Sequence, residues 1–280
     1  KPVRLRGVPR LSDVEACLAL VRSTGEKAGW QGSDVCVSGT PFCSTLPGQT
    51  AEQMRASILF CAPLLARLGR AETSLPGGCK IGARPVDLHL AGLAKMGAQE
   101  HPAGPGRLLL TAPSGLHGAE ITLSFPSVGA TETLLLAAAC AKGQTVLRGA
   151  AREPEIGDLA AFLNRCGGCV EGAGTSTIRI EGRRTLGGCV FSPLPDRIFA
   201  STLACACAAA GGRVELAGCP ASLYAPVLEI LAQMGCAVDT DGDTVRLARF
   251  GRLYGAGRVF TGVYPGLATD AAPLLAAAML

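Results

Sequence analysis

The sequence predicts an α/β fold in which one unit of helices and strands is repeated along the chain. Two observations lead to this prediction. Helical segments that end in a glycine recur about every 70 residues. Short segments with the alternating polar and apolar pattern of half-buried strands follow them. Glycine and proline are frequent but scattered, which favours many turns over a disordered tract.

Four helical segments define the period. They end at Gly25, Gly97, Gly167 and Gly235, which are 72, 70 and 68 residues apart. An apolar residue precedes each glycine by four positions: Val21, Leu93, Leu163 and Leu231. Another precedes it by eleven positions: Val14, Val86, Ile156 and Tyr224. We therefore predict four copies of the same helix.

A second helix and three strands complete the unit. The helix is predicted over 127–143 in one copy and 196–212 in another, each followed by a strand-like run. Residues 2–9 match the strand after that helix, and residues 269–280 match the helix itself. We expect the chain to be a fragment that lacks at least a helix in front and the rest of a domain behind.

Composition excludes several classes of protein. The net charge of +4 is mild, and the basic residues are not interleaved with aromatic ones, so a nucleic-acid partner is not indicated. No apolar run reaches membrane length, and no signal peptide is visible. The 13 cysteines are odd in number and irregularly spaced, which favours buried free thiols in a reducing cytoplasm over a disulfide framework. The oligomeric state stays open.

Six stretches, in order, carry a resemblance to a known family: residues 53–58, 75–93, 125–132, 150–156, 194–198 and 264–270. They resemble the UDP-N-acetylglucosamine 1-carboxyvinyltransferases. That family moves enolpyruvate from phosphoenolpyruvate to the sugar nucleotide, the first committed step of peptidoglycan synthesis. The resemblance implies inside-out α/β barrel (prism) domains of three units each. We expect residues 1–195 in the first domain and 196–280 in the second, both truncated, with no cofactor and no metal.

Cys79 follows Gly77 and Gly78, which give the loop conformational freedom. Lys80 and Arg84 lie close in sequence and would favour a thiolate. Taken alone, Cys79 reads better as a buried, inert cysteine. The resemblance implies instead that it donates a proton to the methylene carbon of phosphoenolpyruvate and reacts with fosfomycin.

The resemblance assigns Arg84, the four residues after it, and Arg55 to substrate binding. Arg84 could be an ordinary surface arginine, but a guanidinium suits both a carboxylate and a phosphate. The resemblance places it at the phosphoenolpyruvate and nucleotide site with Pro85, Val86, Asp87 and Leu88. Arg55 resembles a sugar-nucleotide contact.

A third group precedes a predicted helix: Phe125, Pro126, Ser127, Val128 and Gly129. Ser127 reads first as an N-cap, and the resemblance adds nucleotide binding. Asp270 could also be only a cap. The resemblance makes it the base that accepts the proton of the sugar 3-hydroxyl, so the predicted catalytic residues are Cys79 and Asp270.

Other readings are weaker. Cys166 and Cys169 spell a CxxC motif, yet Gly167 between them occupies the helix-ending turn of the repeat, which argues against a redox or metal site. Phe199, Ser201, Ala271 and Ala272 depart from the residues usual in the family. These departures keep a non-catalytic UDP-sugar-binding homologue open, beside the shikimate-pathway enolpyruvyl transferase, which lacks the Gly-Gly-Cys loop. The fragment itself is expected to be inactive.

Overall fold

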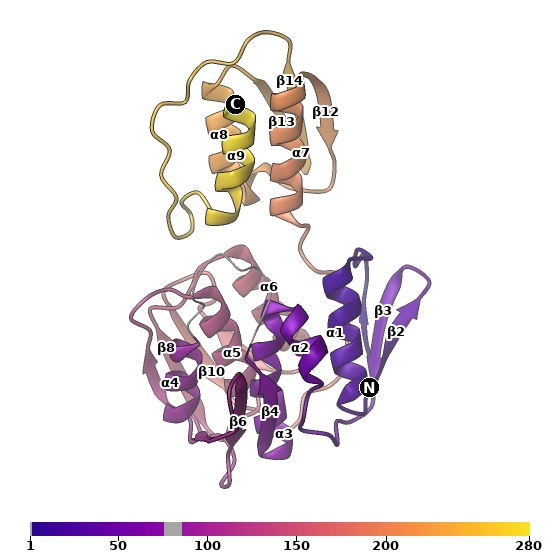
Figure 1. The fold of residues 1–280 in the computed structure, drawn as a ribbon, viewed down its shortest axis with the longest axis vertical. Coiled ribbons are helices and arrows are strands. Elements are labelled where there is room, and N and C mark those ends of the chain that lie inside the picture. The colour runs from indigo at the N-terminus through magenta and orange to yellow at the C-terminus, as the bar shows by residue number, and fades with distance from the viewer. Residues whose placement is uncertain (1, 76–85) are drawn as a thin grey trace. The chain divides into compact units, whose positions relative to one another are not determined.

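The computed structural model describes residues 2–75 and 86–280. The chain divides into two compact units, Lys1–Pro193 and Leu194–Leu280. Each unit is built from helices beside small sheets (Figure 1). None of the helices within the described residues is long and apolar enough to cross a membrane.

The first sheet of unit 1 has the strand order β11-β1-β3-β2. β1 pairs in parallel with β11 and antiparallel with β3, so the two ends of unit 1 meet in one sheet. Helix α1 lies beside β2. The elements are β1 (Val3–Leu5), α1 (Ser12–Ser23), β2 (Lys27–Gln31), β3 (Asp34–Ser38) and β11 (Val190–Phe191).

The second sheet has the order β4-β6-β5, and Thr45 extends it by a parallel bridge to Glu72 of β4. Its elements are α2 (Gly48–Gln53), the 3-10 helix η1 (Arg55–Phe60), α3 (Cys61–Leu68), β4 (Arg70–Ser74), α4 (Asp87–Lys95), β5 (Gln99–His101) and β6 (Arg107–Thr111).

The third sheet repeats this arrangement in the order β7-β8-β10-β9. Its elements are β7 (Glu120–Thr122), α5 (Val128–Ala138), β8 (Gln144–Arg148), α6 (Pro154–Arg165), β9 (Cys169–Glu171) and β10 (Thr177–Glu181). Helix α5 contacts α3, α4, α6 and η1 and is buried around most of its circumference. It is therefore a central helix of the hydrophobic core of unit 1.

Unit 2 contains one complete copy of the repeat and the start of another. Its sheet has the order β12-β14-β13, and its core is separate from that of unit 1. The elements are α7 (Arg197–Ala210), β12 (Gly212–Leu216), η2 (Ala221–Leu223), α8 (Ala225–Gln233), β13 (Ala237–Asp241), β14 (Thr244–Arg249), η3 (Thr269–Ala271) and α9 (Ala272–Met279).

The predicted α/β repeat is confirmed. All four helix-ending glycines have a left-handed backbone, with φ of 100° at Gly25, 97° at Gly97, 91° at Gly167 and 101° at Gly235. Side chains other than glycine rarely adopt this conformation, which explains why the glycine recurs with the period. In two copies the apolar residue eleven positions before the glycine lies just outside the helix, Val86 before α4 and Tyr224 before α8. α4 begins at Asp87 with Val86 as its N-cap, and a 3-10 turn precedes α8.

Candidate active site

The N-terminus of α5 is organised by short hydrogen bonds. The Ser127 hydroxyl accepts a bond from the Ala130 N–H at 3.3 Å, so the predicted N-cap is confirmed. The Thr131 hydroxyl donates to the Ser127 carbonyl at 2.8 Å and accepts from the Ala151 N–H at 3.0 Å. The first-turn N–H groups of an α-helix have no partner within the helix, so a helix start of this kind can donate hydrogen bonds to an anionic or carbonyl oxygen.

Helix α4 packs against this end of α5 through His89. Its Nδ1 lies 2.8 Å from the Thr133 Oγ1. A Cβ atom placed on Gly129 would lie 3.1 Å from the His89 Cε1, so the imidazole ring covers that glycine. Val86 and Leu88 pack their side chains onto the core of unit 1. Asp87 is exposed in the first turn of α4, where a carboxylate stabilises the helix dipole.

Ionisable groups from several elements act on one another here. Burial lowers the pKa of His89, Arg55 lowers it further, and Asp87 opposes both. Burial also raises the pKa of Glu132 to about 7, with Glu155 and Glu153 adding to the rise and Arg55 opposing it. Arg55 therefore acts electrostatically on both α4 and α5, and His89 is neutral at pH 7.

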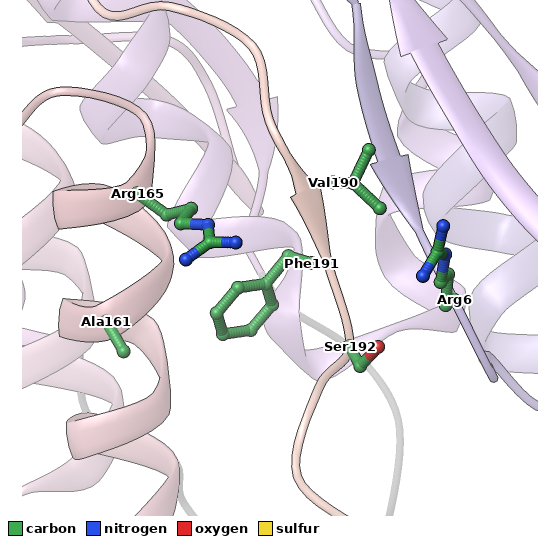
Figure 2. Close-up of a pocket in the computed structure, with 6 residues that line it drawn as sticks. All are labelled: Arg6, Ala161, Arg165, Val190, Phe191 and Ser192. Atoms are coloured by element: carbon green, nitrogen blue, oxygen red, sulfur yellow. The ribbon is translucent and has the colours of Figure 1, made fainter.

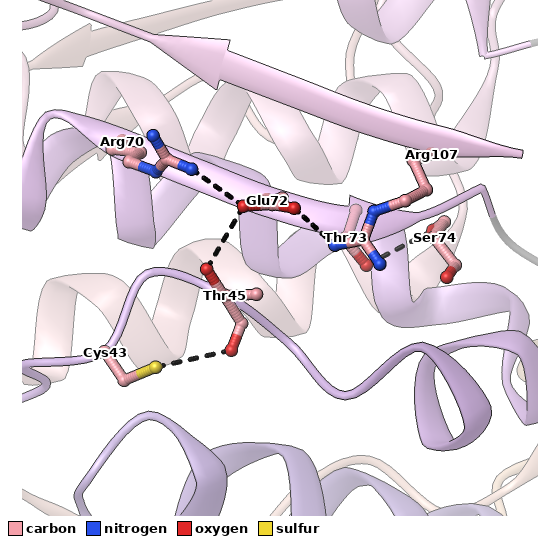
Figure 3. Close-up of polar contacts among 7 residues, drawn as sticks. All are labelled: Cys43, Thr45, Arg70, Glu72, Thr73, Ser74 and Arg107. Carbon is pink, nitrogen blue, oxygen red and sulfur yellow. Dashed lines mark hydrogen bonds and ion pairs between the residues drawn. The ribbon is translucent and has the colours of Figure 1, made fainter. Parts of the chain in front are cut away.

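Strand β4 fixes the beginning of the segment that leads to Cys79. The Glu72 carboxylate accepts hydrogen bonds from Arg70 at 2.7 Å, from Arg107 and from the Thr45 hydroxyl at 3.3 Å (Figure 3). These arginine hydrogen bonds lower the pKa of Glu72. Just beyond the strand, the Leu75 N–H donates to the Gly106 carbonyl at 2.8 Å.

Three predicted residues, Cys79, Arg84 and Pro85, lie outside the described residues. The described chain resumes at Val86, directly before α4. The segment that contains the three residues thus joins β4 to the helix start that carries Asp87 and His89.

Asp270 lies in unit 2 as the middle residue of η3, the 3-10 helix that leads into α9. It is exposed, and neither η3 nor α9 has a side-chain hydrogen bond at its N-cap. The alternative that Asp270 is only a helix cap is therefore wrong. Its backbone is held by the turn that precedes it, in which the Gly262 N–H donates to the Leu267 carbonyl at 2.9 Å.

A shallow surface pocket of about 440 Å³ lies elsewhere in unit 1 (Figure 2). It is lined by α6, β11 and the end of β1, and none of the predicted site residues contributes to it. No group of three or more histidine, cysteine or acidic residues suited to a metal ion occurs in the described part of the chain.

The whole chain matches one family. The family model described as EPSP synthase (3-phosphoshikimate 1-carboxyvinyltransferase) matches residues 1–279. The chain belongs to the EPSP synthase family. Within this family it is 44% identical over 274 residues to a protein from Finegoldia magna and 44% identical over 275 residues to one from Hyphomonas neptunium. Both are named UDP-N-acetylglucosamine 1-carboxyvinyltransferase. Each alignment covers 96% of this chain and 64% of the relative, so the chain spans somewhat less than two thirds of these relatives.

Solved structures of the family share the fold. The enolpyruvyl transferase NikO from Streptomyces tendae superimposes with a TM-score of 0.81 at 24% identity, over 98% of this chain and 66% of that protein. An EPSP synthase from Acinetobacter baumannii gives a TM-score of 0.66 at 22% identity, over 99% and 63%.

Within the family fold, the structure gathers most of the predicted nucleotide-site residues in unit 1. The start of α4 and the segment 125–129 are joined through His89, and Arg55 acts on both helices. Glu132 and Thr133 were not predicted. Glu132 lies inside the resembling stretch 125–132, but the pattern gives no sign that it is half-buried or that its pKa is raised.

Proposed function

We propose that the full-length protein transfers enolpyruvate from phosphoenolpyruvate to the 3-hydroxyl of UDP-N-acetylglucosamine. The observation that carries this proposal is the 44% identity, over 96% of the chain, to relatives that bear the name of this reaction. The run 75–93, with its Gly-Gly-Cys loop and the following Arg-Pro-Val-Asp-Leu, supports it. The shikimate-pathway reaction is not favoured, because the Finegoldia and Hyphomonas relatives are named for the other reaction.

The nucleotide would bind at the N-terminus of α5. Phe125, Pro126, Ser127, Val128 and Gly129 form the approach to this helix and its first turn. The positive end of the α5 dipole and the guanidinium of Arg55 would provide the positive potential that a diphosphate requires. Phe125 is 58% exposed and offers an apolar surface beside the helix end. Val86, Asp87 and Leu88 would complete the site from α4.

In this proposal Cys79 and Asp270 perform the proton transfers. Asp270 accepts the proton of the 3-hydroxyl as its oxygen bonds to the central carbon of phosphoenolpyruvate, and Cys79 donates a proton to the methylene carbon. Loss of phosphate and of a proton from the methyl group so formed then restores the double bond. Arg84 would hold the carboxylate or phosphate of phosphoenolpyruvate, with Pro85 beside it at the approach to α4.

The proposed reaction is the first committed step of peptidoglycan synthesis, so the protein would serve cell-wall biogenesis, cell shape and cell division. We place it in the cytoplasm. All twelve cysteines among the described residues are free thiols, which suits a reducing compartment.

A non-catalytic UDP-sugar-binding homologue is the alternative, and its basis is the four departures from the family. Three of these positions have a structural explanation. Ser201 is buried, and its hydroxyl donates to the Arg197 carbonyl at 2.7 Å. Ala271 is buried in the core of unit 2, and Ala272 is half-buried at the first position of α9. Phe199 is 62% exposed on α7, and nothing in the structure explains it.

Phosphate release by the full-length protein separates the two functions. We expect release from phosphoenolpyruvate with UDP-N-acetylglucosamine and none with shikimate 3-phosphate. Cys79→Ser and Asp270→Asn should each lower kcat by about 100-fold or more, because each removes a group that transfers a proton. Cys43→Ser is the matched control, since Cys43 is a half-buried thiol outside the site and should leave kcat unchanged. Binding of the sugar nucleotide without phosphate release would favour the non-catalytic homologue.

Fosfomycin provides an independent test of the thiol. Mass spectrometry should find one covalent adduct on Cys79, and Cys79→Asp should abolish the adduct. An adduct on any other cysteine, or none at all, would remove Cys79 from its proposed role.

A further inference from the structure

Two thiols that the proposed reaction does not use lie in contact in unit 1. Cys166 is the C-cap residue of α6, and Cys189 directly precedes β11. Their sulfur atoms are 3.5 Å apart. Cys166 is only 6% exposed, whereas Cys189 is half-buried and open to small reagents.

The backbone on both sides holds this contact in place. The Gly187 N–H donates to the Cys166 carbonyl at 2.7 Å, which ties the segment before Cys189 to the end of α6. The Arg4 N–H donates to the Cys189 carbonyl at 2.8 Å and fixes that residue to β1. Phe162 of α6 and Phe191 of β11 form an edge-to-face pair with ring centroids 5.5 Å apart. The two thiols therefore meet between elements that are already packed together.

This pair differs from the CxxC motif. Cys169 begins β9, where its backbone pairs with Glu181 of β10. Gly167 forms the left-handed turn that ends α6, so the two cysteines of the motif belong to different elements. The thiol that Cys166 contacts is 23 residues away in the sequence.

We propose that Cys166 and Cys189 are a redox-active pair that forms a reversible disulfide by exchange with a low-molecular-weight disulfide such as oxidised glutathione. A disulfide needs a sulfur separation of about 2.0 Å, so the two side chains have to approach by about 1.5 Å. Rotation about the Cα–Cβ bond of the more exposed Cys189 can supply this movement.

The exchange proceeds in two balanced steps. The Cys189 thiolate attacks glutathione disulfide, which gives a mixed disulfide and releases one glutathione. The Cys166 thiolate then attacks the Cys189 sulfur and releases the second glutathione. The two protein thiols are oxidised, the glutathione disulfide is reduced, and the two thiol protons pass to the glutathiones. Burial and the hydrogen bond to Cys189 raise the pKa of Cys166 to about 12, so the second step should accelerate with rising pH.

The bond would join the two walls of the shallow pocket. Ala161 and Arg165 line it from α6, and Val190 and Phe191 of β11 line it together with the following Ser192. Phe191 points toward α6, while Val190 points to the other side of the strand (Figure 2). Because β11 ends just before the chain leaves unit 1, the disulfide would fix the last strand of this unit to its last helix.

The test uses the 280-residue chain, incubated with oxidised glutathione, alkylated, and digested with trypsin without reduction. Cleavage after arginine places Cys166 and Cys169 together in peptide 166–179 and Cys189 in peptide 185–197. We expect these two peptides to be cross-linked in the wild type and in the Cys169→Ser variant, and the link to disappear with dithiothreitol. The oxidised chain should also unfold at a temperature roughly 5–10 °C higher.

Variants identify the residues that form the bond. Cys166→Ser should abolish the cross-link and leave a glutathione adduct on Cys189, and Cys189→Ser should abolish both. Circular dichroism of each reduced variant shows whether it remains folded. Cross-linking that needs Cys169, a disulfide within peptide 166–179, or a stable glutathione adduct on Cys189 of the folded wild type would overturn the proposal.

Discussion

The His89 Nδ1 and the Thr133 Oγ1 lie 2.8 Å apart and join the first turn of α4 to the second turn of α5. Both residues are buried, so water cannot readily take the place of one partner if the other loses it. This hydrogen bond positions the ring that covers Gly129, at the helix end where the nucleotide is proposed to bind.

Replacing Thr133 by valine should therefore destabilise unit 1 by about 1–2 kcal/mol, because the shape is kept while a buried nitrogen loses its partner. Urea unfolding measures this change. Thr145→Val is the matched control. The Thr145 hydroxyl is fully buried and has no hydrogen-bond partner in the described part of the chain, so its loss should be neutral or stabilising. Equal losses in the two variants would mean that the His89 bond contributes nothing.

Glu132 should make the stability of unit 1 depend on pH. Its pKa rises from 4.5 to about 7 on folding, mainly through burial. A group whose pKa rises on folding stabilises the native state fully below pH 4.5, and this contribution is lost as the pH rises toward 7.

The Glu132→Gln variant should consequently be more stable than the wild type at pH 8, by up to about 3 kcal/mol, and nearly equal to it at pH 4.5. Denaturant unfolding across this pH range measures the difference. The pH dependence that His89 contributes has the opposite sign, because its lowered pKa reduces stability as the pH falls below 6.5. This contribution is the same in the wild type and in Glu132→Gln, so it cancels in the comparison. A difference that does not change with pH would contradict the assignment to Glu132.

Ser127→Ala should separate helix capping from nucleotide binding. Loss of the cap costs about 1 kcal/mol of stability. If the first turn of α5 also holds the nucleotide, the affinity of the full-length protein for UDP-N-acetylglucosamine should fall by roughly 5-fold or more, as expected for a lost hydrogen bond. Isothermal titration calorimetry measures this affinity.

Asp196→Ala provides the stability reference, because the Asp196 carboxylate accepts bonds from the Ile198 and Phe199 N–H groups at 2.9 Å each and caps α7 in unit 2. Unchanged affinity in Ser127→Ala would show that Ser127 is only a cap.

The repeat was predictable because its signals are local. A left-handed turn favours glycine, and the apolar residue four positions earlier lies on the buried face of the helix in three of the four copies, at Leu93, Leu163 and Leu231. The capping role of Ser127 was predictable for the same reason. The burial of Glu132 and the bond between His89 and Thr133 were not, since they depend on α4 packing against α5 across 44 residues. The Cys166–Cys189 contact was hidden likewise, because its partners meet only through the packing of β11 against α6.

Helices α4 and α5 pack closely together at Gly92. A Cβ atom at this position would lie 2.5 Å from the Leu134 Cδ2 and 2.8 Å from its Cδ1. Leu134 is fully buried in the core of unit 1, so its side chain cannot move aside without displacing other residues. Overpacking of this kind costs about 1–3 kcal/mol.

Gly92→Ala should therefore destabilise the chain, although alanine is favoured over glycine in a helix by about 1 kcal/mol. Gly157→Ala in α6 is the matched control, because a Cβ atom there would meet nothing within 4 Å. That variant should gain about 0.5–1 kcal/mol of stability. Thermal unfolding of both variants measures the contrast. A stabilised Gly92→Ala variant would mean that α4 and α5 can move apart at this point. The proposed nucleotide site needs the start of α4 to stay beside the N-terminus of α5, so this result would argue against it.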